Sequence, residues 1–152
     1  MPSQIQLNFP DYPFRFRTNN GKEEIFDIAR KKYIRLNPEE WVRQNMIMYL
    51  HHELGFPLSM IAVEKQISLH GMTRRFDLAV YKATGLPVML VECKAPEVEI
   101  QQGVMDQAGR YNLVLKVPYL CVTNGLVHYF CKKSPDGSGW EFLEQIPHFN
   151  EL

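Results

Sequence analysis

Apolar and polar residues alternate along several short stretches of this chain, a pattern that predicts strands. Residues 13–18 alternate in this way and end at Asn19-Asn20-Gly21, which predicts a turn and a returning strand over residues 22–28. Turn-forming residues separate the remaining alternating or apolar runs. Those runs predict five more strands, at residues 61–69, 72–82, 87–94, 118–123 and 126–132.

Two other stretches have helical spacing. The first begins with Asn37 as a cap and Pro38 at the first helical position, and we expect it to run to Leu54 before Gly55 ends it. The second covers residues 100–116, where apolar side chains recur three or four positions apart. The order of strands, helix, three strands, helix and two strands predicts an α/β or α+β domain.

Length and charge narrow the class of protein. The chain has 152 residues, 17 basic and 17 acidic, which excludes a disordered or strongly basic chain, and three cysteines do not fit a disulfide scaffold. We expect a single domain over 1–152: N-terminal strands in residues 1–36, a core in 37–133 and an acidic extension in 134–152. That extension carries four acidic side chains and no Lys or Arg, so the remainder is mildly basic and compatible with a phosphate-rich partner.

The sequence gives no sign of a membrane segment. No apolar run approaches the roughly 18 residues that a membrane span needs. The first residues, Met1-Pro2-Ser3-Gln4, show no charged leader followed by an apolar stretch. We therefore expect a cytoplasmic protein that does not bind a membrane.

Ionisable residues stand at the ends of two otherwise apolar strands. Alternation puts Asp77 with Arg75, Ala79 and Tyr81 on one face of its strand, opposite Phe76, Leu78 and Val80, and it puts Glu92 with Lys94 on one face of the next strand. Burying an unpaired charge costs several kcal/mol, so such groups pair with one another or bind a metal ion. Two carboxylates directed at one point suit Mg²⁺, with the lysine beside a water or phosphate. The alternative is a salt-bridged strand pair, Asp77 with Lys94 or Arg75 with Glu92.

Three segments follow one another in a recognisable order: RFDLAV at residues 75–80, VECKAP at 91–96 and QAGRY at 107–111. This order resembles the PD-(D/E)XK nuclease superfamily, and within it the N-terminal nuclease domain of type I restriction enzyme motor subunits. The Gln-x-x-x-Tyr pair resembles the extra motif of RecB-type nucleases. The helix start PEEWVRQ at 38–44 and Thr123-Asn124-Gly125 also match that family, so the likeness runs from about residue 25 to residue 130.

The resemblance implies a restriction-endonuclease-like core, a central mixed sheet flanked by helices. It also implies that Asp77 and Glu92 bind Mg²⁺ or Mn²⁺, while Lys94 positions the attacking water or neutralises the phosphate. Gln107 and Tyr111 would line the site from the second helix, although Tyr111 also falls in that helix's apolar stripe. The family takes a further acidic residue from the first helix. We expect Glu40 in that role, with Glu39 as the alternative, while Glu40 is also placed to form a capping box with Asn37.

The implied activity is Mg²⁺-dependent hydrolysis of DNA phosphodiester bonds, an endonuclease function in a restriction system. DNA is the implied partner, and a separate helicase or modification subunit is a further one, because the chain holds no G-x-x-x-x-G-K-[ST] phosphate-binding loop. A non-catalytic nucleic-acid- or protein-binding module on the same fold is the alternative function. A structural subunit with salt-bridged strands is a third.

Overall fold

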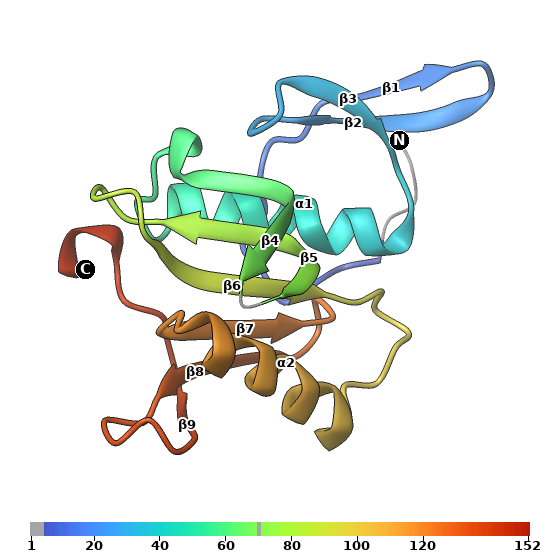
Figure 1. The fold of residues 1–152 in the computed structure, drawn as a ribbon. Coiled ribbons are helices and arrows are strands. Elements are labelled where there is room, and N and C mark those ends of the chain that lie inside the picture. The colour runs from blue at the N-terminus through green and yellow to red at the C-terminus, as the bar shows by residue number, and fades with distance from the viewer. Residues whose placement is uncertain (1–4, 70) are drawn as a thin grey trace.

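A computed structural model describes residues 5–69 and 71–152, except for the side chains of residues 69, 72 and 111–115 (Figure 1). Two sheets and two α-helices make up the domain. A small antiparallel sheet has the order β1-β2-β3, and a larger mixed sheet has the order β4-β5-β6-β7-β8-β9. The strands are β1 (Phe16–Asn19), β2 (Lys22–Asp27), β3 (Lys32–Arg35), β4 (Ile61–Leu69), β5 (Met72–Tyr81), β6 (Pro87–Cys93), β7 (Tyr119–Thr123), β8 (His128–Lys133) and β9 (Trp140–Leu143).

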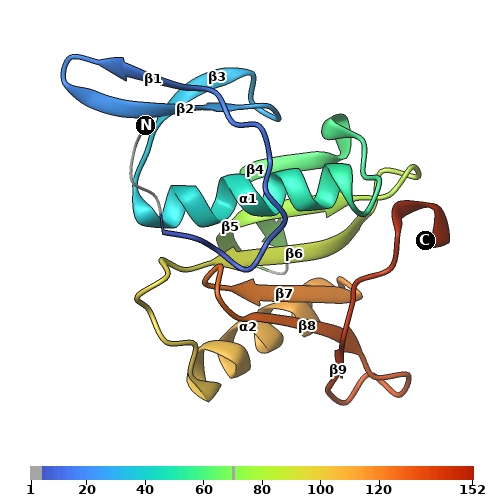
Figure 2. The same ribbon diagram turned by 180° about the vertical axis from the view of Figure 1, so that it is seen from behind.

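The helices lie on opposite faces of the larger sheet. Helix α1 (Pro38–His52) lies between the small sheet and strands β4–β6, and helix α2 (Gln102–Leu115) covers the other face near β7 (Figures 1 and 2). Strands β6 and β7 are parallel, so α2 is the crossover that such a pair requires, and every other pairing is antiparallel. Short 3-10 turns occur at Leu58–Met60 and Phe149–Glu151. The predicted central mixed sheet flanked by helices is confirmed.

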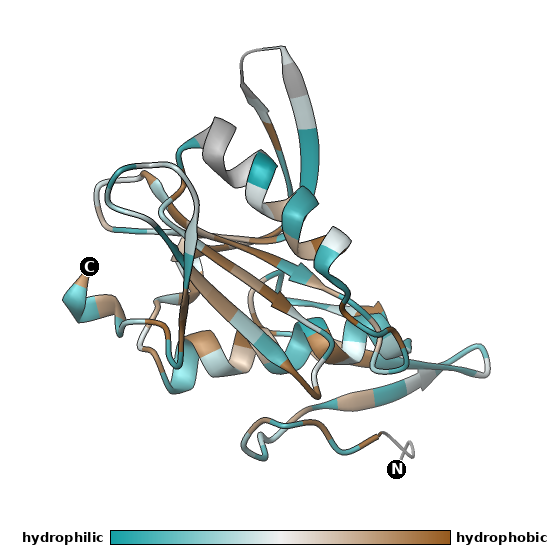
Figure 3. Cartoon of the chain, turned by 90° about the horizontal axis from the view of Figure 1, so that it is seen from below, coloured by the Kyte–Doolittle hydropathy of each residue, from teal (hydrophilic) through white to brown (hydrophobic). Residues whose placement is uncertain are grey.

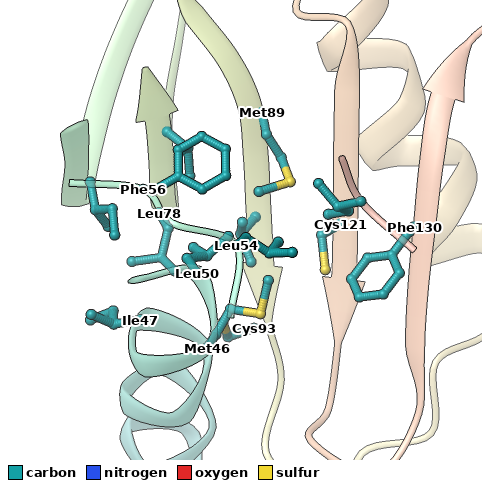
Figure 4. Close-up of a cluster of buried hydrophobic side chains, with 14 of the residues drawn as sticks. Met46, Ile47, Leu50, Leu54, Phe56, Leu78, Met89, Cys93, Cys121 and Phe130 are labelled. Carbon is teal, nitrogen blue, oxygen red and sulfur yellow. The ribbon is translucent and has the colours of Figure 1, made fainter. Parts of the chain in front are cut away.

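The main core lies between α1 and the larger sheet. Met46, Ile47 and Leu50 of α1 pack against apolar side chains of β5, β6 and β7, as Figure 4 shows. Hydrophobic residues accordingly follow the strands of this sheet (Figure 3). Helix α1 begins as expected, because the Asn37 side chain accepts a hydrogen bond from the Glu40 backbone N–H at 2.8 Å. Among the described residues, no helix is both long and apolar enough to cross a membrane.

Strand alternation breaks at Asp77. Leu78 and Val80 pack in the core beneath α1, whereas Phe76 and Ala79 pack with Leu90 on the opposite face. The expectation that Phe76, Leu78 and Val80 share a face is therefore wrong. The expectation that Asp77 and Ala79 lie on one face is wrong as well. The cause is a local irregularity of the ladder, since the register passes from Val63↔Leu78 to Lys65↔Phe76 without a pair at Asp77.

Two other local features differ from expectation. The sequence pattern does not predict strand β3, because it has only four residues, two of them charged, and follows directly after Arg30 and Lys31. The connection between β7 and β8 is longer than a two-residue turn, because Thr123 pairs with His128 and the Asn124 side chain accepts hydrogen bonds from the N–H groups of Leu126 and Val127. Within this loop Gly125 has φ +86°, and a Cβ there would lie 2.8 Å from a Leu7 methyl group.

Candidate functional site

Asp77 is held at the break in β5 by contacts from two other elements. Its Oδ2 accepts a hydrogen bond from the Cys93 backbone N–H at 2.8 Å, at the end of β6. Its Oδ1 accepts one from Nη2 of Arg43 in α1 at 2.9 Å. The distorted strand thus turns a carboxylate toward α1, and both of its oxygens have a fixed partner.

Glu92 is buried near the end of β6. Its carboxylate forms an ion pair with Nη2 of Arg74 at 2.5 Å, and the Arg74 guanidinium in turn lies 5.0 Å from the centre of the Phe76 ring. Burial raises the pKa of Glu92, and the nearby charge of Asp77 raises it further, while Arg74 and Lys94 act in the opposite direction. The charges of Arg74, Asp77 and Lys94 therefore all act on the Glu92 carboxyl group.

The side chains of the two acidic residues at the start of α1 have different surroundings. Glu40 is buried and accepts hydrogen bonds from Arg43 at 2.8 Å, from Gln44 at 2.9 Å and from Arg30 at 3.3 Å. Glu39 is about half exposed and lies 3.5 Å from Nη2 of Arg43, the same group that donates to Asp77. Its pKa is raised by partial burial and by the negative charge of Asp77. The geometry accordingly favours Glu39, the alternative choice, as the helix acid next to Asp77, and it favours Glu40 as part of an arginine network.

Lys94 follows directly after β6. Its backbone N–H donates to the Thr123 carbonyl at 2.8 Å, which extends the alignment of β6 and β7 by one residue. Its positive charge lowers the pKa of both Glu39 and Glu92 against the effects that raise them. Asp77 and Lys94 thus both act electrostatically on Glu39 of α1 and on Glu92 of β6.

The residues from α2 stand apart from these residues in the described contacts. Gln107 is exposed, and none of the interactions found among the described side chains joins it to Asp77, Glu92 or Lys94. Tyr111 lies in α2, but its side chain is outside the described part of the chain. The roles expected for this pair remain predictions.

Arg43 and its partners were missed by sequence reasoning. The Arg43 guanidinium is buried, and although burial alone would lower its pKa, the charges of Glu40 and Asp77 outweigh that effect and raise it. Behind it, the fully buried Asp27 accepts hydrogen bonds from Arg30 and Gln44. A charged network thus runs from the small sheet through α1 to Asp77. The available signal was Arg43-Gln44 in the matching PEEWVRQ segment.

Glu64 adds a strained residue to the same network. It has φ +52° within β4, a left-handed conformation that non-glycine residues rarely adopt in a strand, and it stands at the missing pair opposite Asp77. This conformation brings its carboxylate to 3.4 Å from Arg30 and 3.7 Å from Arg43. These contacts link Glu64 to both arginines of the network.

The donor chemistry of Asp77 and Glu92 fits a hard divalent cation. Mg²⁺ takes oxygen ligands, commonly only one or two carboxylates together with waters, and Asp77 and Glu92 supply that number. Across residues 5–69 and 71–152 no group of three or more His, Cys, Asp or Glu side chains is arranged to hold a metal ion. The strand carboxylates are instead paired with Arg43 and Arg74. A metal ion would therefore bind through Asp77 and Glu92 in competition with two guanidinium groups.

This α+β domain has a clear relationship to known proteins. The model of the family described as type I restriction enzyme R protein N terminus matches residues 38–147. The chain therefore belongs to that family.

A solved structure and the curated proteins complete the comparison. The fold is similar to a fragment assigned to an HsdR subunit of a type I restriction enzyme from Vibrio vulnificus YJ016, with a TM-score of 0.56 and 22% sequence identity. The similarity covers 77% of this chain and 24% of that one, so the present chain spans about a quarter of its length. No curated protein matches this chain.

Proposed function

We propose that this domain is a divalent-metal-dependent nuclease that hydrolyses DNA phosphodiester bonds within a type I restriction system. The observation that carries the proposal is the 2.8 Å hydrogen bond from the Cys93 backbone N–H to Asp77, which joins the Asp77 carboxylate to the backbone between Glu92 and Lys94. Nη2 of Arg43 links Asp77 to the helix acid Glu39, at 2.9 and 3.5 Å. Membership of the R-protein N-terminal family supports a restriction-related role. The partners of such a domain would be DNA and the motor or modification subunits of the system.

Each of these residues has a distinct task in this proposal. Asp77 and Glu92 would hold Mg²⁺ or Mn²⁺, which when bound polarises the phosphodiester and makes a bound water more acidic. The Lys94 ammonium would lie against the phosphate or the attacking water and offset negative charge there. Arg43 keeps Asp77 in place through its 2.9 Å hydrogen bond, and Glu39 would accept a proton or orient a water at the entrance to the site.

Plasmid cleavage tests the proposal. The wild-type chain is incubated with supercoiled plasmid in Mg²⁺, in Mn²⁺ and in EDTA, alongside Asp77→Asn and Glu92→Gln. The exposed Glu141→Gln in β9 is a matched control that also removes one carboxylate. We expect nicking or linearisation only with a divalent cation, loss of at least tenfold in both site variants, and an unchanged rate in the control.

The alternative is a binding module that keeps the fold without cleaving. The pairing of both strand carboxylates with arginines favours it, because those pairs satisfy the charges with no metal ion. DNA binding by the wild type with no cleavage in either cation would establish this alternative and overturn the nuclease proposal. Cleavage that persists in EDTA, or in both site variants, would also overturn it.

A further inference from the structure

The small sheet has one buried face and one free face. Phe16, Ile25 and Ile34 stand in register with one another and turn toward α1, and Ile25 is completely buried. Because side chains alternate along a strand, the residues between them turn away from the rest of the domain. This outer face consists of Arg15, Arg17, Lys22, Glu24, Phe26, Tyr33 and Arg35.

The outer face is strongly basic although the chain as a whole is neutral. Four of its residues are cationic, and Glu24 is its one acidic member. The Glu24 carboxylate is already engaged by Nε of Arg17 at 2.6 Å. Arg15, Lys22 and Arg35 are exposed. The face therefore presents a net charge of about +3 to solvent, which attracts a polyanion.

Two of the guanidinium groups are held by aromatic rings. Arg15 lies 3.9 Å from the centre of the Phe26 ring, and Arg17 lies 4.1 Å from that of Tyr33. The two rings contact each other edge to face at 5.2 Å. Stacking fixes the plane of a guanidinium while its N–H groups remain free to donate at the edge, which lowers the entropy lost on binding a phosphate.

The outer face also extends toward the candidate site. Arg35 lies four residues before Glu39, on the strand that leads into α1. Figures 1 and 2 show the β1–β2 hairpin projecting past the N-terminal end of α1, the end at which Glu39 lies. A long polyanion that lies along the face therefore runs to the end of the molecule that carries the site.

We propose that the outer face of the β1–β3 sheet binds the sugar–phosphate backbone of double-stranded DNA without reading its sequence. The choice of DNA as the polyanion rests on the proposed function, whereas the surface itself rests on charge and geometry. Contacts from Arg and Lys to phosphates position a duplex and give affinity that falls with salt, but they carry no base information. The face would hold the duplex while a separate part of the domain acts on it.

Salt-dependent binding of a labelled 20-base-pair duplex, measured in EDTA, tests the inference. The test variant is Arg15→Gln/Lys22→Gln/Arg35→Gln, which leaves the Arg17–Glu24 pair intact. The matched control is Lys65→Gln/Lys116→Gln/Lys132→Gln, which removes three exposed positive charges elsewhere. Each lost phosphate contact lowers the slope of log K against log salt by about 0.9. We expect at least tenfold weaker binding and a slope reduced by about 2.7 in the test variant, with little change in the control.

A further variant separates stacking from charge. Phe26→Leu keeps every cation but frees Arg15, so we expect severalfold weaker binding with an unchanged salt slope. Melting curves establish that each variant is folded. Where the triple variant fails to fold, the exposed pair Lys22→Gln/Arg35→Gln replaces it, with an expected slope change of about 1.8.

Three results would overturn the inference: unchanged binding in the test variant, an equal loss in test variant and control, or displacement of the duplex by polyglutamate of the same total charge and concentration. The last would assign the face to an acidic protein. Because binding is measured in EDTA on uncut DNA, absence of nuclease activity leaves this inference standing. Conversely, binding that is unchanged in the test variant would overturn this inference alone, because the roles of Asp77 and Glu92 are tested separately by the plasmid assay.

Discussion

Arg43 of α1 donates a hydrogen bond to Asp77 of β5 at 2.9 Å, and this contact joins the helix to the sheet at the point where the strand ladder breaks. The same guanidinium donates to Glu40 at 2.8 Å. One buried cation thus links a helix carboxylate to a strand carboxylate 37 positions away in the sequence, with Glu39 and Glu64 at 3.5 and 3.7 Å from the same guanidinium. The candidate site is therefore built on a charged network rather than on an isolated strand pair.

Removing this cation should unfold the domain more easily. In Arg43→Met both Glu40 and Asp77 lose a buried partner, and breaking a buried ion pair costs about 3–5 kcal/mol. We expect the free energy of unfolding, measured by urea denaturation, to fall by about that amount. The exposed Arg110→Met in α2 is the control and should change it by less than about 0.5 kcal/mol. Equal effects of the two substitutions would show that the Arg43 network contributes little.

The neighbouring acids Glu39 and Glu40 should respond in opposite ways. Glu40→Gln removes a buried charge that faces Arg30 and Arg43, so we expect a stability loss of about 2 kcal/mol or more. Glu39→Gln removes a half-exposed charge beside Asp77, so we expect a nearly unchanged melting temperature and at least tenfold slower plasmid cleavage. If Glu40→Gln is stable and Glu39→Gln cleaves normally, Glu40 is the helix acid and the assignment from geometry is wrong.

Titration of Glu92 should be visible in the pH dependence of the free energy of unfolding. Its pKa is raised in the folded protein, mainly by burial, from an ordinary value of 4.5. The folded state then binds the proton more tightly than the unfolded state, so this group's contribution to stability falls as pH rises from about 4.5 through the folded pKa. Urea denaturation at several pH values should show a weaker decline over that window in Glu92→Gln than in the wild type. Parallel profiles would mean that the carboxyl titrates normally.

Much of the fold follows from local signals in the sequence. Asn20-Gly21 sets the first hairpin, Asn37 and Pro38 begin α1, and the apolar run of 87–93 marks the buried strand β6. The conformation at Asp77 does not follow from such signals. It depends on Glu64, a residue on a different strand whose left-handed backbone no local pattern indicates.

The site was accordingly predictable only in part. Spacing and resemblance select Asp77, Glu92 and Lys94, and the structure joins Asp77 to the backbone N–H of Cys93, between the other two. Their roles stay predictions. The choice between Glu39 and Glu40 depends on Arg30, which reaches Glu40 from outside α1, and on the direction in which Arg43 of the same helix turns. Helical spacing alone does not separate two adjacent acids in a first turn, and the sequence expectation of Glu40, with Glu39 as the alternative, could not draw on these contacts.

Gln107 tests how far the family resemblance extends. It is exposed in α2, so Gln107→Ala should leave the melting temperature nearly unchanged. If the Gln-x-x-x-Tyr motif acts on the substrate, the same variant should lose about tenfold or more in cleavage, equivalent to ~1.4 kcal/mol. The adjacent exposed position Asp106→Ala serves as a control for general effects on α2. Wild-type cleavage by Gln107→Ala would remove the RecB-type motif from the account while leaving the strand residues in place.

The rate of Mg²⁺-dependent plasmid cleavage by Lys94→Ala tests the central claim most directly, because Lys94 has a catalytic role in the nuclease account and none in a merely salt-bridged strand pair. The account predicts at least a hundredfold loss, about 2.7 kcal/mol of transition-state stabilisation, with the melting temperature retained. The exposed Lys65→Ala should cleave like the wild type. Cleavage by Lys94→Ala within twofold of the wild-type rate would contradict the account.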